Sequence, residues 1–123
     1  MQRISFVSLP VSDQDRAIDF YTSHLGFAVQ TDAPYTEGWR WIFLTLPDAE
    51  TRLHFARRGE VTFNEVPALA LTTEDVDADC ARWRAAGVTI TGGPDDAPWQ
   101  PGVRWATLRD SEGNLVFVES KKP

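Results

Sequence analysis

The chain carries one short motif twice, and this repetition constrains its fold more than any other feature. Residues 38–41 read Gly-Trp-Arg-Trp, and residues 102–105 read Gly-Val-Arg-Trp. An apolar run follows each copy, and a loop that contains proline precedes it. A motif that recurs after about half of the chain length indicates two copies of one structural module.

The pattern of apolar residues predicts the same order of elements in both halves. In the first half we expect a strand at 4–11, a helix from an N-cap at Ser12 or Asp13 to about His24, and strands at 27–31, 39–46 and 52–56. In the second half we expect a strand at 67–73, a helix at 76–86, and strands at 88–90, 103–108 and 115–119. Polar, proline-containing loops are expected at 31–38 and 92–101. Each half therefore reads β-α-β-β-β.

This order predicts an α+β fold of two tandem β-α-β-β-β modules. We expect a single domain over residues 1–123, with module one at 1–58 and module two at 64–123. A charged connector at about 57–65 is the expected boundary between the modules.

Composition excludes several classes of partner. The net charge is -6, so the basic surface that binds nucleic acid is not expected, and an acidic surface mildly favours cationic or neutral ligands. No run approaches the roughly 20 apolar residues that span a membrane, and the N-terminus lacks the apolar core of a signal peptide. Cys80 is the only cysteine, which precludes an intrachain disulfide and suits a cytoplasmic protein.

Short motifs in both halves resemble the vicinal oxygen chelate superfamily of glyoxalases, bleomycin resistance proteins and extradiol dioxygenases. The matching segments are residues 11–13, 17–21 and 25–27 in the first half, and 75–77, 85–88 and 109–115 in the second. The resemblance implies two modules whose curled mixed sheets surround a cavity. It also implies a homodimer, in which the cavity is sometimes shared between chains.

The resemblance also implies four metal-ligand positions, in the first and last strands of each module. Here these positions hold Phe6, His54, Ala68 and Phe117, so only one of the four carries a ligand. A catalytic divalent ion normally has at least three protein ligands. Glu119 adds only a second ligand if the last strand is shifted by two residues. We therefore predict a protein without a metal or other cofactor.

Other chemistry-bearing residues have structural alternatives. Cys80 and Trp83 lie on the apolar stripe of the second helix and are expected in the core, and His24 suits a helix end. Trp41 and Trp105 occupy equivalent positions, where they either pack in the core or stack on a ligand. Arg40 and Arg104 either form surface ion pairs or reach an anionic ligand.

We predict a metal-independent small-molecule-binding protein, similar to bleomycin resistance proteins, that holds an aromatic or cationic ligand in an apolar cavity. The expected ligand contacts are Phe6, Trp39, Trp41, His54, Trp99, Trp105 and Phe117. Trp99 is the favoured contact because it lies in a loop. The alternatives are a lyase, isomerase or dioxygenase that uses a divalent metal, a metal-free enzyme with His54 or Glu119 as general base, or a structural or regulatory domain with a collapsed cavity.

Overall fold

The computed structural model describes residues 1–59 and 66–121. The chain forms two compact units, Met1–Thr62 and Phe63–Pro123, each with one helix and one four-stranded sheet. Most of the expected connector at 57–65 lies outside the described residues. Each unit is described by itself below.

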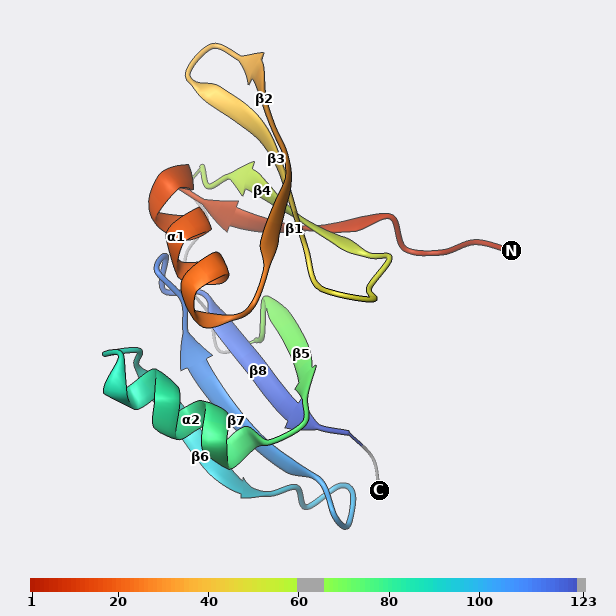
Figure 1. Ribbon diagram of the computed structural model, residues 1–123, viewed down its shortest axis with the longest axis vertical. Helices are drawn as coiled ribbons and strands as arrows, with labels where there is room; N and C mark the ends of the chain where they lie inside the picture. Colours follow the sequence, from red (N-terminus) through yellow and green to blue (C-terminus); the bar gives the residue numbers. More distant parts are fainter. Residues whose placement is uncertain (60–65, 122–123) are drawn as a thin grey trace. The chain divides into compact units, whose positions relative to one another are not determined.

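Unit 1 has the element order β-α-β-β-β and a mixed sheet with strand order β1-β4-β3-β2 (Figure 1). Strands β1 and β4 pair in parallel, whereas the pairs β4–β3 and β3–β2 are antiparallel. The elements are β1 (Phe6–Val11), α1 (Gln14–His24), β2 (Ala28–Thr36), β3 (Trp39–Thr45) and β4 (Arg52–Arg57).

Unit 2 repeats this arrangement, with strand order β5-β8-β7-β6 and a parallel pair between β5 and β8. Its elements are β5 (Leu69–Thr73), α2 (Val76–Ala85), β6 (Ile90–Asp96), β7 (Arg104–Arg109) and β8 (Leu115–Ser120). The prediction of an α+β fold built from two tandem modules is confirmed.

Equivalent aspartates begin the two helices. The Asp13 carboxylate accepts a hydrogen bond of 3.0 Å from the Arg16 backbone N–H, and Asp75 accepts the same bond from Ala78. These bonds satisfy backbone donors that have no partner inside the helix. Of the two predicted N-caps of the first helix, Asp13 is therefore the one that caps it.

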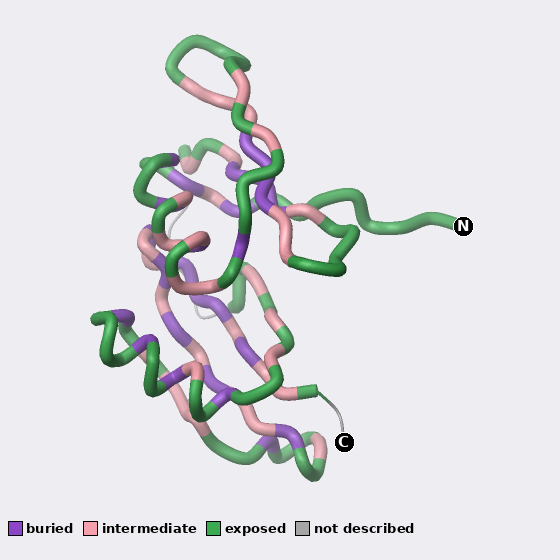
Figure 2. The backbone as a smooth tube through the Cα atoms, in the orientation of Figure 1, coloured by how far each residue is buried: buried purple, intermediate pink, exposed green. Residues whose placement is uncertain are grey.

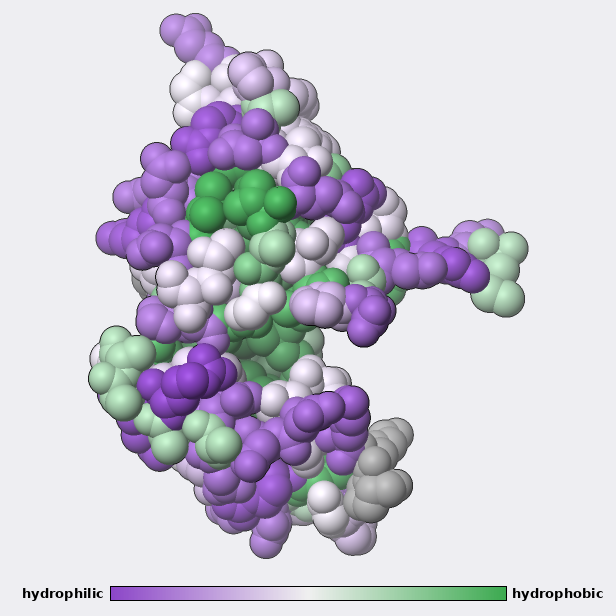
Figure 3. Space-filling model, viewed as in Figure 1, coloured by the Kyte–Doolittle hydropathy of each residue, from purple (hydrophilic) through white to green (hydrophobic). Residues whose placement is uncertain are grey.

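In unit 1 the core lies between α1 and one face of the sheet. Tyr21 of α1 is fully buried, and its ring centroid lies 5.8 Å from that of Phe55. Alternate residues of β1, β3 and β4 complete this core: Leu9, Val11, Ile42, Leu44, Leu53 and Phe55. Figure 2 shows the buried segments along these strands, and in Figure 3 hydrophilic residues cover the outer side of α1. The remaining alternate residues of these strands lie on the other face of the sheet.

In unit 2 the core follows the same plan. Val76, Cys80 and Trp83 are the buried residues of α2, which contacts β6, β7 and β8. They share the core with Ala106, Leu108, Val116 and Val118. The predicted core positions of Cys80 and Trp83 are confirmed, and burial raises the pKa of the Cys80 thiol.

The expected loops at 31–38 and 92–101 are wrong in their first parts, because β2 continues to Thr36 and β6 to Asp96. Both strands lie at sheet edges and contain a proline, Pro34 or Pro94. An edge strand needs hydrogen bonds on one side only, so a proline does not interrupt it. The pairing shifts register between Val29 and Thr31 and between Gly92 and Asp95, which obscures the alternation of apolar residues.

Within the described part of the chain, no helix is long and apolar enough to cross a membrane.

Candidate functional site

Four rings gather on the face of the unit 1 sheet that points away from α1. We call Phe6, Trp41, Phe43 and His54 the His54 cluster. Strand β3 places Phe43 opposite His54, and strand β1 places Ser8 opposite His54 on the other side. Phe6 lies two residues before Ser8 in β1 and therefore on the same face. The His54 ring centroid lies 4.3 Å from Trp41, 5.3 Å from Phe6 and 5.8 Å from Phe43. The register of three strands therefore brings together three of the predicted ligand contacts.

His54 is the polar member of this cluster. Its Nδ1 lies 3.1 Å from the Ser8 hydroxyl oxygen, at hydrogen-bond distance. Its Nε2 is buried and has no hydrogen-bond partner among the described residues. Only 8% of the residue is exposed, and burial lowers the pKa of the imidazole below its usual value of 6.5. Burial of His54 therefore favours the neutral form of the imidazole.

Two further side chains lie at the border of the His54 cluster. The Tyr35 ring contacts Trp41 at a centroid distance of 5.0 Å and is largely exposed. The Arg52 guanidinium carbon lies 4.0 Å from the centroid of the Phe43 ring, a cation–π contact. The border of the cluster thus consists of an exposed aromatic ring, Tyr35, and the guanidinium of Arg52.

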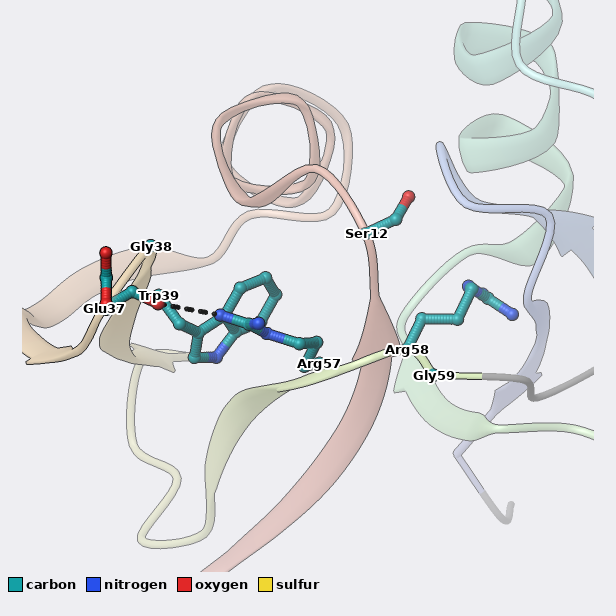
Figure 4. A pocket seen from close by; sticks show the side chains of 7 residues that line it. All are labelled: Ser12, Glu37, Gly38, Trp39, Arg57, Arg58 and Gly59. Atoms are coloured by element: carbon teal, nitrogen blue, oxygen red, sulfur yellow. Dashed lines mark hydrogen bonds between the residues drawn. The ribbon is translucent and has the colours of Figure 1, made fainter.

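Trp39 lies apart from the His54 cluster. In the described residues, its one ring interaction is with the Arg57 guanidinium, 5.0 Å from the ring centroid. Both residues line a surface cavity of about 370 Å³ together with Ser12, Glu37, Gly38, Arg58 and Gly59. Figure 4 shows Arg57 lying along Trp39, while the side chains of Ser12 and Arg58 point away from it. Trp39 therefore lies at this cavity and Trp41 in the His54 cluster, although the two are only two residues apart.

Unit 2 carries a second aromatic group, formed by Trp99, Trp105 and Phe117, which we call the Trp105 cluster. Trp105 and Phe117 are nearly parallel, with 12° between planes and 6.5 Å between centroids. Trp99 lies 6.4 Å from Trp105 and 6.0 Å from Phe117, and 57% of it is exposed. The loop tryptophan is thus joined to two strand residues on the face opposite α2.

Glu119 lies beside this second cluster. It is the cross-strand partner of Trp105, and as the second residue after Phe117 it shares the same face of the sheet. The carboxylate has no ion-pair partner among the described residues. Glu119 on β8 and Asp95 on β6 are thus both cross-strand partners of Trp105.

Arg40 and Arg104, the arginines of the repeated motif, form ion pairs in equivalent ways. Arg40 pairs with Asp15 at 2.8 Å and Asp32 at 3.0 Å, and Arg104 pairs with Asp77 at 2.7 Å and Asp96 at 3.2 Å. These pairs hold the pKa of Asp15 and Asp77 below the ordinary value. Of the two predicted roles, surface ion pairing is therefore the one observed.

The four positions at which the resemblance implies metal ligands do not fit a divalent ion here. Phe6 supplies a ring that contacts His54, and Phe117 lies in the Trp105 cluster. Ala68 precedes β5, where its backbone N–H donates to the Leu115 carbonyl. No group of three His, Cys, Asp or Glu side chains that could hold a metal occurs in residues 1–59 and 66–121. Of these four positions, only His54 holds a side chain that can bind a metal, and aromatic rings surround its imidazole.

Sequence reasoning missed Ser8, Phe43 and Gln14. Phe43 follows Trp41 by two residues, so strand alternation could have placed it on the same face. Ser8 is 46 residues from His54, and only the parallel register of β1 and β4 pairs them. Gln14 is buried, and its amide bonds both backbone groups of Arg40, at 2.8 and 3.2 Å.

Comparison with known proteins identifies the family. The profile of the Glyoxalase/Bleomycin resistance protein/Dioxygenase superfamily matches residues 3–118. The uncharacterized protein YurT of Bacillus subtilis (strain 168) is 32% identical, over 97% of this chain and 99% of its own.

Two solved structures from Streptomyces sp. CB03234 are also similar. The antibiotic-binding protein TnmS3 is 33% identical, with a TM-score of 0.82 over 99% of this chain and 98% of its own. A glyoxalase/bleomycin resistance protein is 36% identical, with a TM-score of 0.74 over 94% of this chain and 98% of its own. The chain therefore belongs to the Glyoxalase/Bleomycin resistance protein/Dioxygenase superfamily.

Proposed function

We propose that this chain is a metal-independent small-molecule-binding protein that holds an aromatic or cationic ligand against its aromatic clusters. The observation that carries the proposal is the set of aromatic contacts: Phe6 and Phe117 stand where the resemblance implies metal ligands, and each contacts other aromatic side chains. Flat rings bind flat ligands by stacking and cations by their electron-rich faces. TnmS3, which is described as an antibiotic-binding protein, supports this reading.

The chemistry of the two clusters suits these ligand classes. Trp41, Phe6 and Phe43 offer aromatic surface in unit 1, with His54 as a neutral polar group. Trp99, Trp105 and Phe117 offer it in unit 2, with Glu119 as an acidic neighbour. We place Trp39 in the proposal as a separate contact at the cavity beside Arg57.

Equilibrium dialysis against a panel of planar and cationic antibiotics in the presence of EDTA tests the proposal. We expect saturable binding of at least one compound, which mass spectrometry recovers unchanged. Trp41→Ala should weaken binding at the His54 cluster, and Trp105→Ala binding at the Trp105 cluster, by about fivefold or more, since loss of a stacked ring costs about 1–3 kcal/mol. Trp39→Ala reports whether the separate cavity takes part. The absence of binding by the whole panel to the folded protein would contradict the proposal.

One observation favours a second candidate, a metal-free enzyme with His54 as general base. A neutral imidazole with a hydroxyl at Nδ1 has the form that such a base requires. Recovery of a bound compound in altered form, with turnover lost in His54→Gln, would select this candidate instead.

We also propose that the chain works as a cytoplasmic homodimer. The family resemblance and the single buried Cys80 support this proposal. Light scattering should then give a mass of about twice the 13.8 kDa of one chain.

A further inference from the structure

The Nε2 atom of His54 has an unusual environment. It is buried, it has no hydrogen-bond partner in the described residues, and rings of Phe6, Trp41 and Phe43 surround the imidazole. A buried polar atom without a partner destabilises a folded protein, because its hydrogen bond to water is lost and not replaced. Such an atom in a cluster of otherwise apolar rings is suited to bond a ligand that enters the cluster.

Phe6 and Trp41, two of the rings around His54, are themselves partly exposed at the surface. Phe6 is 38% exposed and begins β1, an edge strand of the sheet. Trp41 is partly exposed, and its only ring neighbour beyond the cluster, among the described residues, is the exposed Tyr35. Small movements of the Phe6 and Trp41 side chains can therefore admit a planar ligand between these rings, where it stacks on Trp41 and reaches His54, while the backbone of the sheet stays in place.

The hydrogen bond between Ser8 and His54 Nδ1 determines whether Nε2 is a donor or an acceptor. If the Ser8 hydroxyl donates to Nδ1, the proton of the neutral imidazole lies on Nε2, which then donates. If Nδ1–H donates to the Ser8 oxygen, Nε2 accepts instead. Because a hydroxyl rotates freely between these roles, the Ser8–His54 pair can match either a carbonyl or a hydroxyl on the ligand.

We infer that His54 is a specificity-determining residue that selects aromatic ligands bearing a hydroxyl or carbonyl oxygen, through a hydrogen bond from that oxygen to Nε2. This inference rests on the proposed binding function and deepens it by naming the ligand chemistry. Stacking on Trp41, Phe6 and Phe43 supplies affinity for the ring system, and the Ser8–His54 pair supplies discrimination.

Three probes of one ring system test the inference: naphthalene, 2-naphthol and 2-acetylnaphthalene, each in equilibrium dialysis with the whole chain. We expect both oxygenated probes to bind at least about fivefold more tightly than naphthalene, the ratio that one net hydrogen bond provides. His54→Phe should bring the three affinities together. His24→Phe, the same substitution at the only other histidine, should leave the preference intact.

A second measurement does not depend on the folding of a variant. In the unaltered protein, 2-naphthol should shift the ¹⁵N resonance of His54 Nε2, and naphthalene should shift it much less. The inference would be overturned, and the proposed function would stand, if all three probes bound with equal affinity. The same conclusion would follow if the Nε2 resonance did not shift on addition of 2-naphthol. Failure of every probe to bind would overturn the inference together with the proposal that the aromatic clusters bind such ligands.

Discussion

Gly92 shows how a single missing side chain shapes the Trp105 cluster. A Cβ atom added at this residue would lie 2.8 Å from the Thr107 hydroxyl and 3.1 Å from the Trp105 ring. The indole of Trp105 therefore occupies space that only glycine leaves free at position 92. The orientation of a proposed ligand contact depends on a residue of the neighbouring strand.

We predict that Gly92→Ala displaces Trp105 and lowers the free energy of unfolding by about 1–3 kcal/mol, the usual cost of overpacking. Urea unfolding measures the stability, and near-ultraviolet circular dichroism reports the indole. Gly59→Ala is the matched control, since nothing lies within 4 Å of its added Cβ. Equal stability of the two variants, with an unchanged indole spectrum, would contradict this account of Trp105.

The buried imidazole of His54 predicts a pH dependence of stability. Because its pKa is lowered in the folded state, the unfolded chain takes up the proton first as the pH falls. Stability should be unaffected well above pH 6.5, decline as the pH falls below that value, and level off once the pH is below the folded-state pKa. Asp15 and Asp77 lose their charges only at lower pH, because Arg40 and Arg104 hold their pKa values below 3.8.

Urea midpoints between pH 7.5 and 5 measure this effect. His54→Phe should flatten the decline in that window, whereas His24→Phe should keep it. An identical decline in both variants would show that His54 does not cause it.

At the scale of elements, the two helices were predictable, whereas the extent of the edge strands β2 and β6 was not. Capping aspartates, apolar spacing and a following glycine are local signals, so they fix helices near 14–24 and 76–85 in the sequence itself. Strands β2 and β6 contain prolines, glycines or polar residues, and their pairing is interrupted by shifts of register. Their extended form depends on hydrogen bonds to β3 and β7, which no local pattern reveals.

The same distinction applies to the candidate site. Aromatic residues and the lack of metal ligands are visible in the sequence, because they follow from residue type at positions that the resemblance supplies. The Ser8–His54 pair and the contact of Trp99 with Phe117 join segments that only the folded sheets bring together. The contact of Trp39 with Arg57 likewise joins residues of two strands, β3 and β4.

Helix α1 is fastened to β3 by Gln14. Its amide donates to the Arg40 carbonyl and accepts from the Arg40 N–H, and the side chain is buried. We predict that Gln14→Ala lowers the free energy of unfolding by about 1–3 kcal/mol, because two hydrogen bonds are lost and two backbone groups lose their partner. Gln30→Ala, at an exposed position of β2, should change stability by less than about 0.5 kcal/mol in the same urea experiment. A Gln14→Ala variant as stable as Gln30→Ala would mean that this contact does not hold the helix.

At the scale of the whole molecule, the chain keeps the duplicated framework of its superfamily, and we propose that this framework carries ligand binding in place of metal chemistry. Each unit has the same strand order and an aromatic cluster on the sheet face opposite its helix. Only His54 remains at the four ligand positions, and rings enclose it. The central claim is therefore that this protein binds its ligand without a metal.

A ligand titration of metal-stripped protein tests that claim most directly. Tryptophan fluorescence is recorded during titration with a planar compound found by dialysis, in three conditions: with EDTA, after addition of Zn²⁺, and after addition of Mn²⁺. The account predicts saturable quenching with the same Kd in all three conditions. Binding that is absent in EDTA and restored by a stoichiometric divalent ion would contradict it.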